Sequence, residues 1–130
     1  MVQPPDIPAD VLRFIAERID TVPQLEALLL VWENQPRAWE CEEIAARIYV
    51  RRDVCGDIVQ ALQRRDLLTV ESSTPPRFRY NPAWDESGQL MTQVASAYRT
   101  HLVPITTFIH AKAPSSVREF ARAFDLKKER

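Results

Sequence analysis

Apolar side chains recur every three or four positions near the start of the chain, which predicts a helix from Ala9 to Ile19. A second helix is predicted from Pro23 to about Asn34, because Thr21 and Gln24 are spaced as a capping box at its start. Apolar residues cover most of the circumference of this second helix, so we expect it to be the buried central helix. It ends before Pro36, since the residue preceding a proline avoids the helical region.

The middle of the chain, from Trp39 to Tyr80, predicts two helices followed by two strands. The first of these helices is short, and a tight connection at Tyr49 to Arg52 joins it to a helix running roughly from Asp53 to Arg65. Residues 69–71 and 78–80 are predicted as strands. The loop between the two strands consists of turn-forming residues, which indicates a hairpin.

The last third of the chain has apolar residues at helical spacing from Leu90 to Ile109, which predicts a long amphipathic helix. Pro104 interrupts this pattern and implies a kink or a break, because it lacks a backbone donor. The alternation of apolar and polar residues after Pro104 also leaves a strand open there. Ser115 or Ser116 caps a predicted short final helix, which a charged tail follows.

The composition indicates one ordinary soluble domain. The chain has 130 residues, of which 45% are hydrophobic, and this length is enough to bury a core. No apolar run approaches the length needed to span a bilayer, and the N-terminus lacks the layout of a signal peptide. Two cysteines do not make a disulfide framework, so we expect a cytoplasmic protein with reduced thiols.

Residue patterns that carry enzymatic chemistry are nearly absent, so we predict no enzyme, no catalytic residue and no cofactor. The chain has two glycines in all, which excludes a glycine-rich phosphate-binding loop. A metal site formed by the two cysteines and either His101 or His110 would match no standard zinc spacing. Cys41 and Cys55 are therefore interpreted as buried structural thiols in helices.

Helix, tight turn, helix and two-stranded wing follow one another between residues 23 and 82, and this order resembles the winged helix-turn-helix superfamily. Within it, the sequence is similar to small MarR- or PadR-like bacterial transcription regulators. The resemblance implies a mainly α fold with a small β-wing, in which a short strand at Trp39 pairs with the wing. It also implies that Asp66 ends the preceding helix in a left-handed conformation, where related sequences have glycine. Residues 1–22 then form an N-terminal extension and helix, and residues 83–130 form a C-terminal helical extension.

The same resemblance implies a sequence-specific DNA-binding transcription regulator, whose partner is double-stranded DNA. The helix after the tight turn would enter the major groove, where arginine reads guanine and glutamine reads adenine. The predicted base readers are Arg52, Gln60 and Gln63. The predicted phosphate contacts are Arg51, Arg64, Arg77 and Arg79.

The charge balance supports a second hypothesis. The 17 basic residues are offset by 18 acidic ones, for a net charge of −1, whereas nucleic-acid binders usually gather basic residues to neutralise phosphates. Asp53 and Asp57 would also face the groove, where phosphates repel carboxylates. The alternative is a winged-helix protein–protein interaction module that has lost DNA binding. A continuous positive surface over the helix and the wing would favour DNA, and a mixed surface would favour a protein partner.

The apolar stripe of the predicted C-terminal helix is larger than a peripheral helix needs. It comprises Tyr98, Leu102, Ile105, Phe108 and Ile109. Because regulators of this superfamily commonly dimerise through helices outside the winged unit, we predict a homodimer with this stripe as its interface. Replacing Ile105 and Ile109 with Asp is then expected to give a folded monomer. The alternative is that the stripe packs on the chain's own N-terminal helix.

Overall fold

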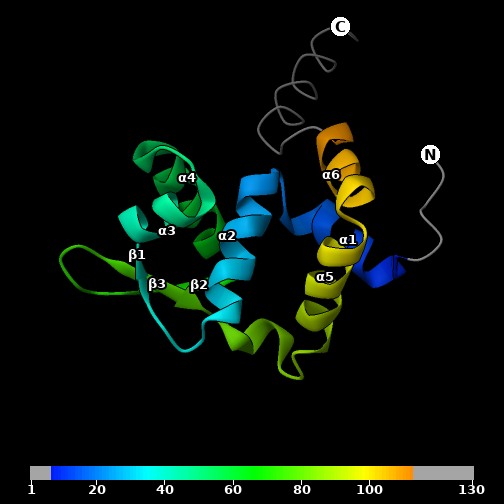
Figure 1. Ribbon diagram of the computed structural model, residues 1–130. Coiled ribbons are helices and arrows are strands. Elements are labelled where there is room, and N and C mark those ends of the chain that lie inside the picture. Colours follow the sequence, from blue (N-terminus) through cyan, green and yellow to red (C-terminus); the bar gives the residue numbers. More distant parts are fainter. Residues whose placement is uncertain (1–6, 113–130) are drawn as a thin grey trace, which may run out of the picture.

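The computed structural model describes residues 7–112, and this part of the chain contains six α-helices, one 3-10 helix and one antiparallel sheet of three strands (Figure 1). In chain order the elements are α1 (Ala9–Arg18), α2 (Val22–Glu33), β1 (Trp39–Glu40), α3 (Cys41–Ile48), α4 (Arg52–Arg64), β2 (Leu68–Glu71), β3 (Arg77–Tyr80), η1 (Pro82–Asp85), α5 (Gln89–Thr100) and α6 (Leu102–Ala111). The predicted mainly helical fold with a small β-wing is confirmed. The short helix predicted after Ser115 or Ser116 lies outside the described residues. Between residues 7 and 112, none of the helices combines the length and the apolar character that crossing a bilayer requires.

Helix α2 begins where its capping residues predict. The Thr21 hydroxyl accepts a hydrogen bond from the backbone N–H of Gln24 at 3.2 Å, which satisfies one of the free donors at the helix start. The reciprocal half of the capping box is displaced by one residue. The Gln24 amide oxygen accepts from the N–H of Asp20 at 2.8 Å, and not from that of Thr21.

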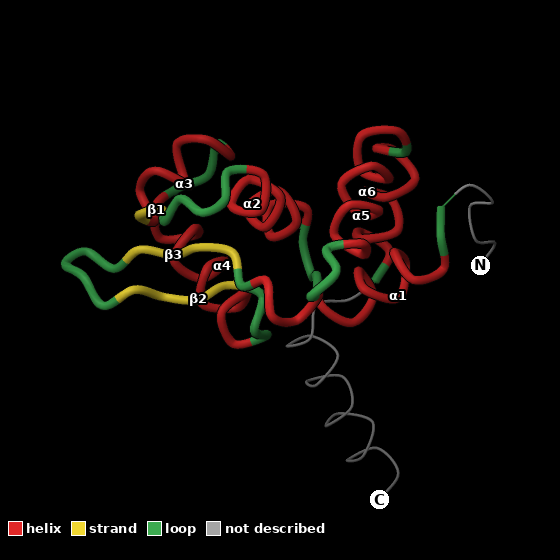
Figure 2. The backbone as a smooth tube through the Cα atoms, turned by 90° about the horizontal axis from the view of Figure 1, so that it is seen from below, coloured by secondary structure: helices red, strands yellow, loops and turns green. Residues whose placement is uncertain are grey.

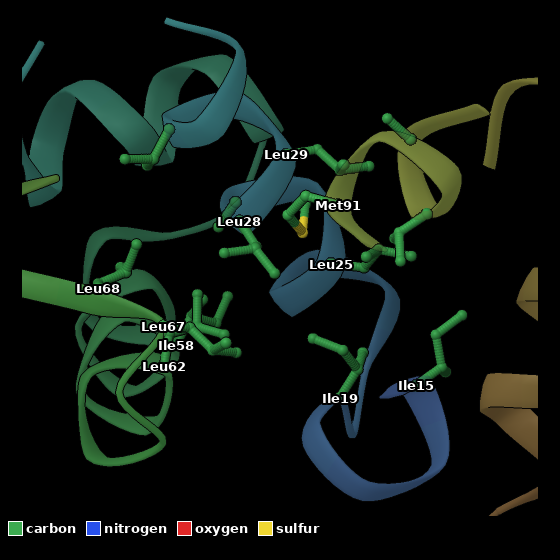
Figure 3. Packing of buried hydrophobic residues seen from close by; sticks show 14 of the residues in the cluster. Ile15, Ile19, Leu25, Leu28, Leu29, Ile58, Leu62, Leu67, Leu68 and Met91 are labelled. Carbon is green, nitrogen blue, oxygen red and sulfur yellow. The ribbon is translucent and has the colours of Figure 1, made fainter. Parts of the chain in front are cut away.

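The leucines of α2 join two groups of buried side chains into one hydrophobic core, as Figure 3 shows. On one side of Leu25, Leu28 and Leu29 are Ile58, Leu62, Leu67 and Leu68, and on the other side are Ile15 and Ile19. Met91 of α5 belongs to the same core. All of these side chains are buried. Burying a side chain of this size stabilises the folded state by roughly 1.5–3 kcal/mol. Helix α2 is therefore the predicted central helix, and the winged unit shares its core with α1 and α5.

The three strands pair in the order β1-β3-β2, and both pairings are antiparallel. Trp39 of β1 is paired with Phe78 of β3, so the short strand predicted at Trp39 is confirmed. On the other side of β3, Leu68 is paired with Tyr80 and Val70 with Phe78. The hairpin of β2 and β3 projects away from the helices as an extended wing (Figure 2), which confirms the two predicted wing strands.

The long C-terminal helix is broken into α5 and α6. Helix α5 ends at Thr100 and α6 begins at Leu102, so the break comes before Pro104 in the chain. A proline has no N–H to donate to the carbonyl four residues earlier, here that of Thr100, and its ring crowds that carbonyl. In the first turn of a new helix the missing donor costs no hydrogen bond, because the N–H groups there have no partner within the helix. The predicted break is confirmed, and the alternative of a strand after Pro104 is wrong.

The apolar stripe of α5 and α6 packs mainly within the chain. Ile105 and Ile109 are 0% and 1% exposed and belong to the hydrophobic core. Helix α5 packs against α1, and the Lys112 ammonium after α6 donates to the carbonyls of Ile15 and Ala16 at 2.7 and 2.8 Å. A subunit interface through Ile105 and Ile109 is therefore wrong. Replacing both with Asp would bury two carboxylates, so we expect that variant to unfold and not to form a folded monomer.

Candidate nucleic-acid interface

A short turn sets the direction of α4 relative to α3. Tyr49 adopts a left-handed backbone with φ of 60°, and the N–H of Val50 donates to the carbonyl of Ala45 at 3.1 Å. This ending of a helix usually takes glycine or asparagine, so a tyrosine there holds some backbone strain. Helix α4 then starts at Arg52, after the tight connection that the sequence predicts.

The far end of α4 is closed by the left-handed residue that the resemblance implies. Asp66 has a φ of 62°, and its N–H donates to the carbonyl of Gln63 at 3.0 Å. The N–H of Leu67 donates to the carbonyl of Leu62, also at 3.0 Å. These two bonds form a Schellman ending, after which the chain passes directly into β2. The exposed helix and the hairpin are thus held on the same side of the molecule, with α1, α5 and α6 on the other (Figure 1).

One face of α4 is exposed along the length of the helix. It carries the four predicted contact residues of this helix, namely Arg52, Gln60, Gln63 and Arg64. Asp53 and Asp57 lie on the same face and are exposed as well. Within residues 7–112, neither Arg52 nor Arg64 forms an ion pair. Their guanidinium groups are therefore available to a partner.

Arg51 precedes α4 and holds Asp53 in the first turn of that helix. Its Nε and Nη2 donate to the two carboxylate oxygens of Asp53 at 3.1 and 2.7 Å. These hydrogen bonds lower the pKa of the Asp53 carboxyl, so it stays ionised. Both side chains are more than two-thirds exposed, and a pair this exposed contributes little to stability. The pair places the negative charge of Asp53 beside Arg51, which is a predicted phosphate contact.

The two arginines of the hairpin are exposed, and the residues that alternate with them on β3 are buried. Arg77 lies 3.4 Å from the carboxylate of Glu40, and Arg79 lies 3.3 Å from that of Glu71. All seven residues predicted to contact DNA are thus on the surface, and three of them are paired with carboxylates. The surface over α4 and the hairpin is mixed in charge.

Two further arginines lie beside the hairpin, and the sequence patterns did not indicate them. The Arg37 guanidinium lies 3.6 Å from the centroid of the Trp39 ring, and that of Arg47 lies 5.4 Å from it, within the range of cation–π attraction. Arg37 also donates to Glu43 at 3.1 Å. The sequence spacing could have indicated the contact of Arg37 with Trp39. The two residues are two positions apart and so share one side of an extended segment.

Arg65 follows the predicted contact Arg64 and has a structural role. Its guanidinium donates to the Asp20 carboxylate at 2.6 Å and to the Arg18 carbonyl at 2.7 Å. Arg18 in turn donates to the carbonyl of Arg65 at 3.0 Å. This reciprocal set of bonds ties the end of α4 to the end of α1, so it fixes how the exposed helix sits on the rest of the fold.

The structure separates the two cysteines in exposure. Cys55 is buried, as predicted, whereas Cys41 is half-buried, so its description as a buried structural thiol is wrong. In the part of the chain from residue 7 to residue 112, no group of three or more His, Cys, Asp or Glu side chains could hold a metal ion.

Comparison with known proteins gives the fold. The chain matches no protein-family model and no curated protein sequence. It is similar to the structure of a MarR family protein from Bacillus stearothermophilus, with a TM-score of 0.52 and 16% identity over 92% of this chain and 81% of that one. The chain has a winged-helix fold. The resemblance to MarR-like winged-helix regulators is thereby confirmed at the level of the fold.

Two more solved structures are similar to the chain over a comparable extent. RV1404 from Mycobacterium tuberculosis has a TM-score of 0.52 and 19% identity, over 93% of this chain and 81% of that one. A MarR family transcription regulator, SP03579, has a TM-score of 0.50 and 22% identity, over 94% of this chain and 83% of that one. Structural similarity at identities this low shows the winged-helix fold alone. The function has to be argued from the residues of α4 and the hairpin.

Proposed function

We propose that this protein is a sequence-specific DNA-binding transcription regulator of the winged-helix type. The observation that carries the proposal is the exposed face of α4, on which arginine and glutamine side chains are available to a partner. The major groove of B-DNA, about 12 Å wide, admits one α-helix, and these two side chains suit guanine and adenine edges. In this arrangement Arg52, Gln60 and Gln63 read bases. Arg51, Arg64, Arg77 and Arg79 contact phosphates.

The ion pairs of Arg51, Arg77 and Arg79 are compatible with phosphate binding. Each pair is exposed, and exposed pairs contribute little to stability, so a phosphate can replace the carboxylate. The displaced carboxylates stay close to the DNA and reduce the local positive charge. We therefore expect weak non-specific binding, and affinity that depends on the base contacts of α4.

The salt dependence of the DNA affinity reports how many phosphates the protein contacts. The slope of log K against log salt should be about −3.6 per chain if four arginines bind phosphates, and about −0.9 if Arg64 alone does. Binding is measured by fluorescence anisotropy on duplexes selected from a random pool, at low and moderate salt. Arg64→Gln should flatten the slope by about 0.9 on every duplex, whereas Gln60→Ala should keep the slope and relax specificity. No saturable binding, or equal binding to every sequence, would contradict the proposal.

A second candidate function is a protein-interaction module, and the mixed charge of the surface favours it. A carboxylate lies beside each of the three paired arginines, which suits a partner that presents both charges. Asp57→Asn separates the two functions. It should weaken binding of a protein partner that purifies with the chain in stoichiometric amount, whereas removal of a carboxylate from the groove should leave DNA affinity equal or higher.

We also propose that the protein acts as a homodimer in the cytoplasm. Leu102 and Val103, at the start of α6, are 49% and 71% exposed, so they are the apolar side chains that this helix offers to a second copy. A two-fold axis near α6 would present two α4 helices to the half-sites of a palindromic operator. This interface through Leu102 and Val103 therefore differs from the one predicted from the sequence, which included the buried residues Ile105 and Ile109.

A further inference from the structure

The two cysteines of the chain lie on the two helices of the helix-turn-helix, which pack against each other, and their thiols interact. Cys41 is the first residue of α3 and is half-buried, and Cys55 lies one turn inside α4 and is fully buried. The Cys41 Sγ is 3.9 Å from the carbonyl oxygen of Arg52. Both thiols are therefore directed at the same part of the α3–α4 interface.

The position of the Cys55 sulfur follows from helix geometry. Side chains on a helix tilt toward its N-terminus, so the Cys55 side chain is directed at the preceding turn of α4, which carries the carbonyls of Arg52 and Arg51. The Cys41 sulfur contacts the first of these carbonyls, and a side-chain hydrogen bond links the Cys41 thiol to that of Cys55, so the two thiols are adjacent. Burial, together with the adjacent Cys41 thiol, raises the pKa of Cys55 to about 12. Cys55 thus stays protonated, and the more accessible Cys41 is the thiol that an oxidant meets first.

We propose that Cys41 and Cys55 form an oxidisable dithiol, which a hydroperoxide converts into a disulfide between α3 and α4. The Cys41 thiolate attacks one peroxide oxygen, the O–O bond breaks, and water or an alcohol leaves, so that Cys41 becomes a sulfenic acid. The Cys55 sulfur then attacks the Cys41 sulfur. The S–S bond forms, and the sulfenic hydroxyl leaves as water with the Cys55 proton. The dithiol loses two electrons, and the peroxide gains them.

The disulfide would act on the start of α4. Its sulfur atoms are about 2.05 Å apart, which is well inside the distance of a non-bonded contact, so bond formation draws the first turn of α4 toward α3. Arg51, Arg52 and Asp53 lie at this end of the helix. The functional consequence rests on the proposed DNA binding, and we expect oxidation to weaken it about tenfold, the size of a typical coupling between two sites.

The chemistry is tested without DNA. Reduced full-length protein receives one equivalent of hydrogen peroxide, and intact mass, free thiols and cross-linked peptides are measured. We expect the mass of two hydrogen atoms and both free thiols to be lost, with the Cys41 peptide joined to the Cys55 peptide.

The matched variants separate the two steps. Cys55→Ala should stop at a sulfenic acid on Cys41, seen as one added oxygen and trapped by dimedone, and Cys55→Ser replaces it if the alanine variant does not fold. Cys41→Ser should keep the Cys55 thiol free. Wild-type protein that retains both thiols, keeps a lasting sulfenic acid, or forms cross-linked dimers would overturn the proposal.

A second measurement tests the coupling. Oxidised and reduced proteins are compared on the selected duplex. Binding about tenfold weaker after oxidation, recovered with a reductant and unaffected by peroxide in Cys41→Ser, supports the coupling. A disulfide that forms without changing the affinity overturns the coupling and leaves the proposed function intact. If the disulfide forms and neither state binds DNA, the proposed function fails and the dithiol stands.

Discussion

At the scale of single residues, two neighbouring arginines at the end of α4 differ in role. Arg64 is exposed, whereas Arg65 and its partner Asp20 have side chains only 21% and 12% exposed. Arg65→Ala removes the guanidinium from Asp20 and from the Arg18 carbonyl, and breaking a pair this buried is costly. We expect the free energy of unfolding to fall by about 2–4 kcal/mol, measured by urea denaturation.

Arg64→Ala is the matched control for this prediction. The same substitution one residue earlier changes an exposed side chain, so the free energy of unfolding should stay within about 0.5 kcal/mol of wild type. Its effect should appear in DNA binding, through the lost phosphate contact. Equal stability of the Arg64 and Arg65 variants would contradict the structural role of Arg65.

At the scale of elements, a hydrogen bond joins α5 to α2. The Tyr98 hydroxyl donates to the Glu26 carboxylate at 3.0 Å, and burial, aided by Glu26, raises the pKa of Tyr98 to about 12. Because the pKa in the folded state is above the ordinary value of 10.0, the resulting stability is fully present below pH 10 and is lost as the pH rises through about 12.

The Tyr98→Phe variant tests this contact. It lacks the hydroxyl, so between pH 10 and pH 12 its free energy of unfolding should fall less steeply than that of wild type. At neutral pH the variant should be less stable by about 1 kcal/mol, the usual net value of a hydrogen bond. Urea denaturation at several pH values measures both effects. Tyr80, whose pKa burial also raises, is present in both proteins, so its contribution cancels. Parallel pH profiles would show that the Tyr98 bond does not hold α5 to α2.

At the scale of the whole molecule, the proposed homodimer depends on two exposed side chains of α6. Replacing Leu102 and Val103 with Glu should give a folded monomer, because both are exposed and acidic residues suit the first turn of a helix. Sedimentation velocity measures the mass, and circular dichroism checks the fold. Ile105→Glu is the control and should unfold the chain, since Ile105 is fully buried. A wild type that is monomeric at high concentration would refute the proposed interface.

The points where helices begin and end follow from the sequence by itself, because they depend on interactions between close neighbours in the chain. The Thr21 cap starts α2, Asp66 ends α4, and Pro104 interrupts the C-terminal helix, each through bonds within a few residues. Helical spacing also indicates which side of α4 faces away from the core. The four predicted contact residues on α4 are therefore exposed.

The electrostatic and packing partners were decided by the tertiary structure alone, because they come from distant parts of the chain. The guanidinium of Arg65 meets Asp20 across 45 positions, and that of Arg77 meets Glu40 across 37. An apolar stripe has the same pattern whether it covers its own core or a second subunit, so the burial of Ile105 and Ile109 could not be read from periodicity. The interaction between the Cys41 and Cys55 thiols likewise exists only because the turn at Tyr49 brings α3 and α4 together.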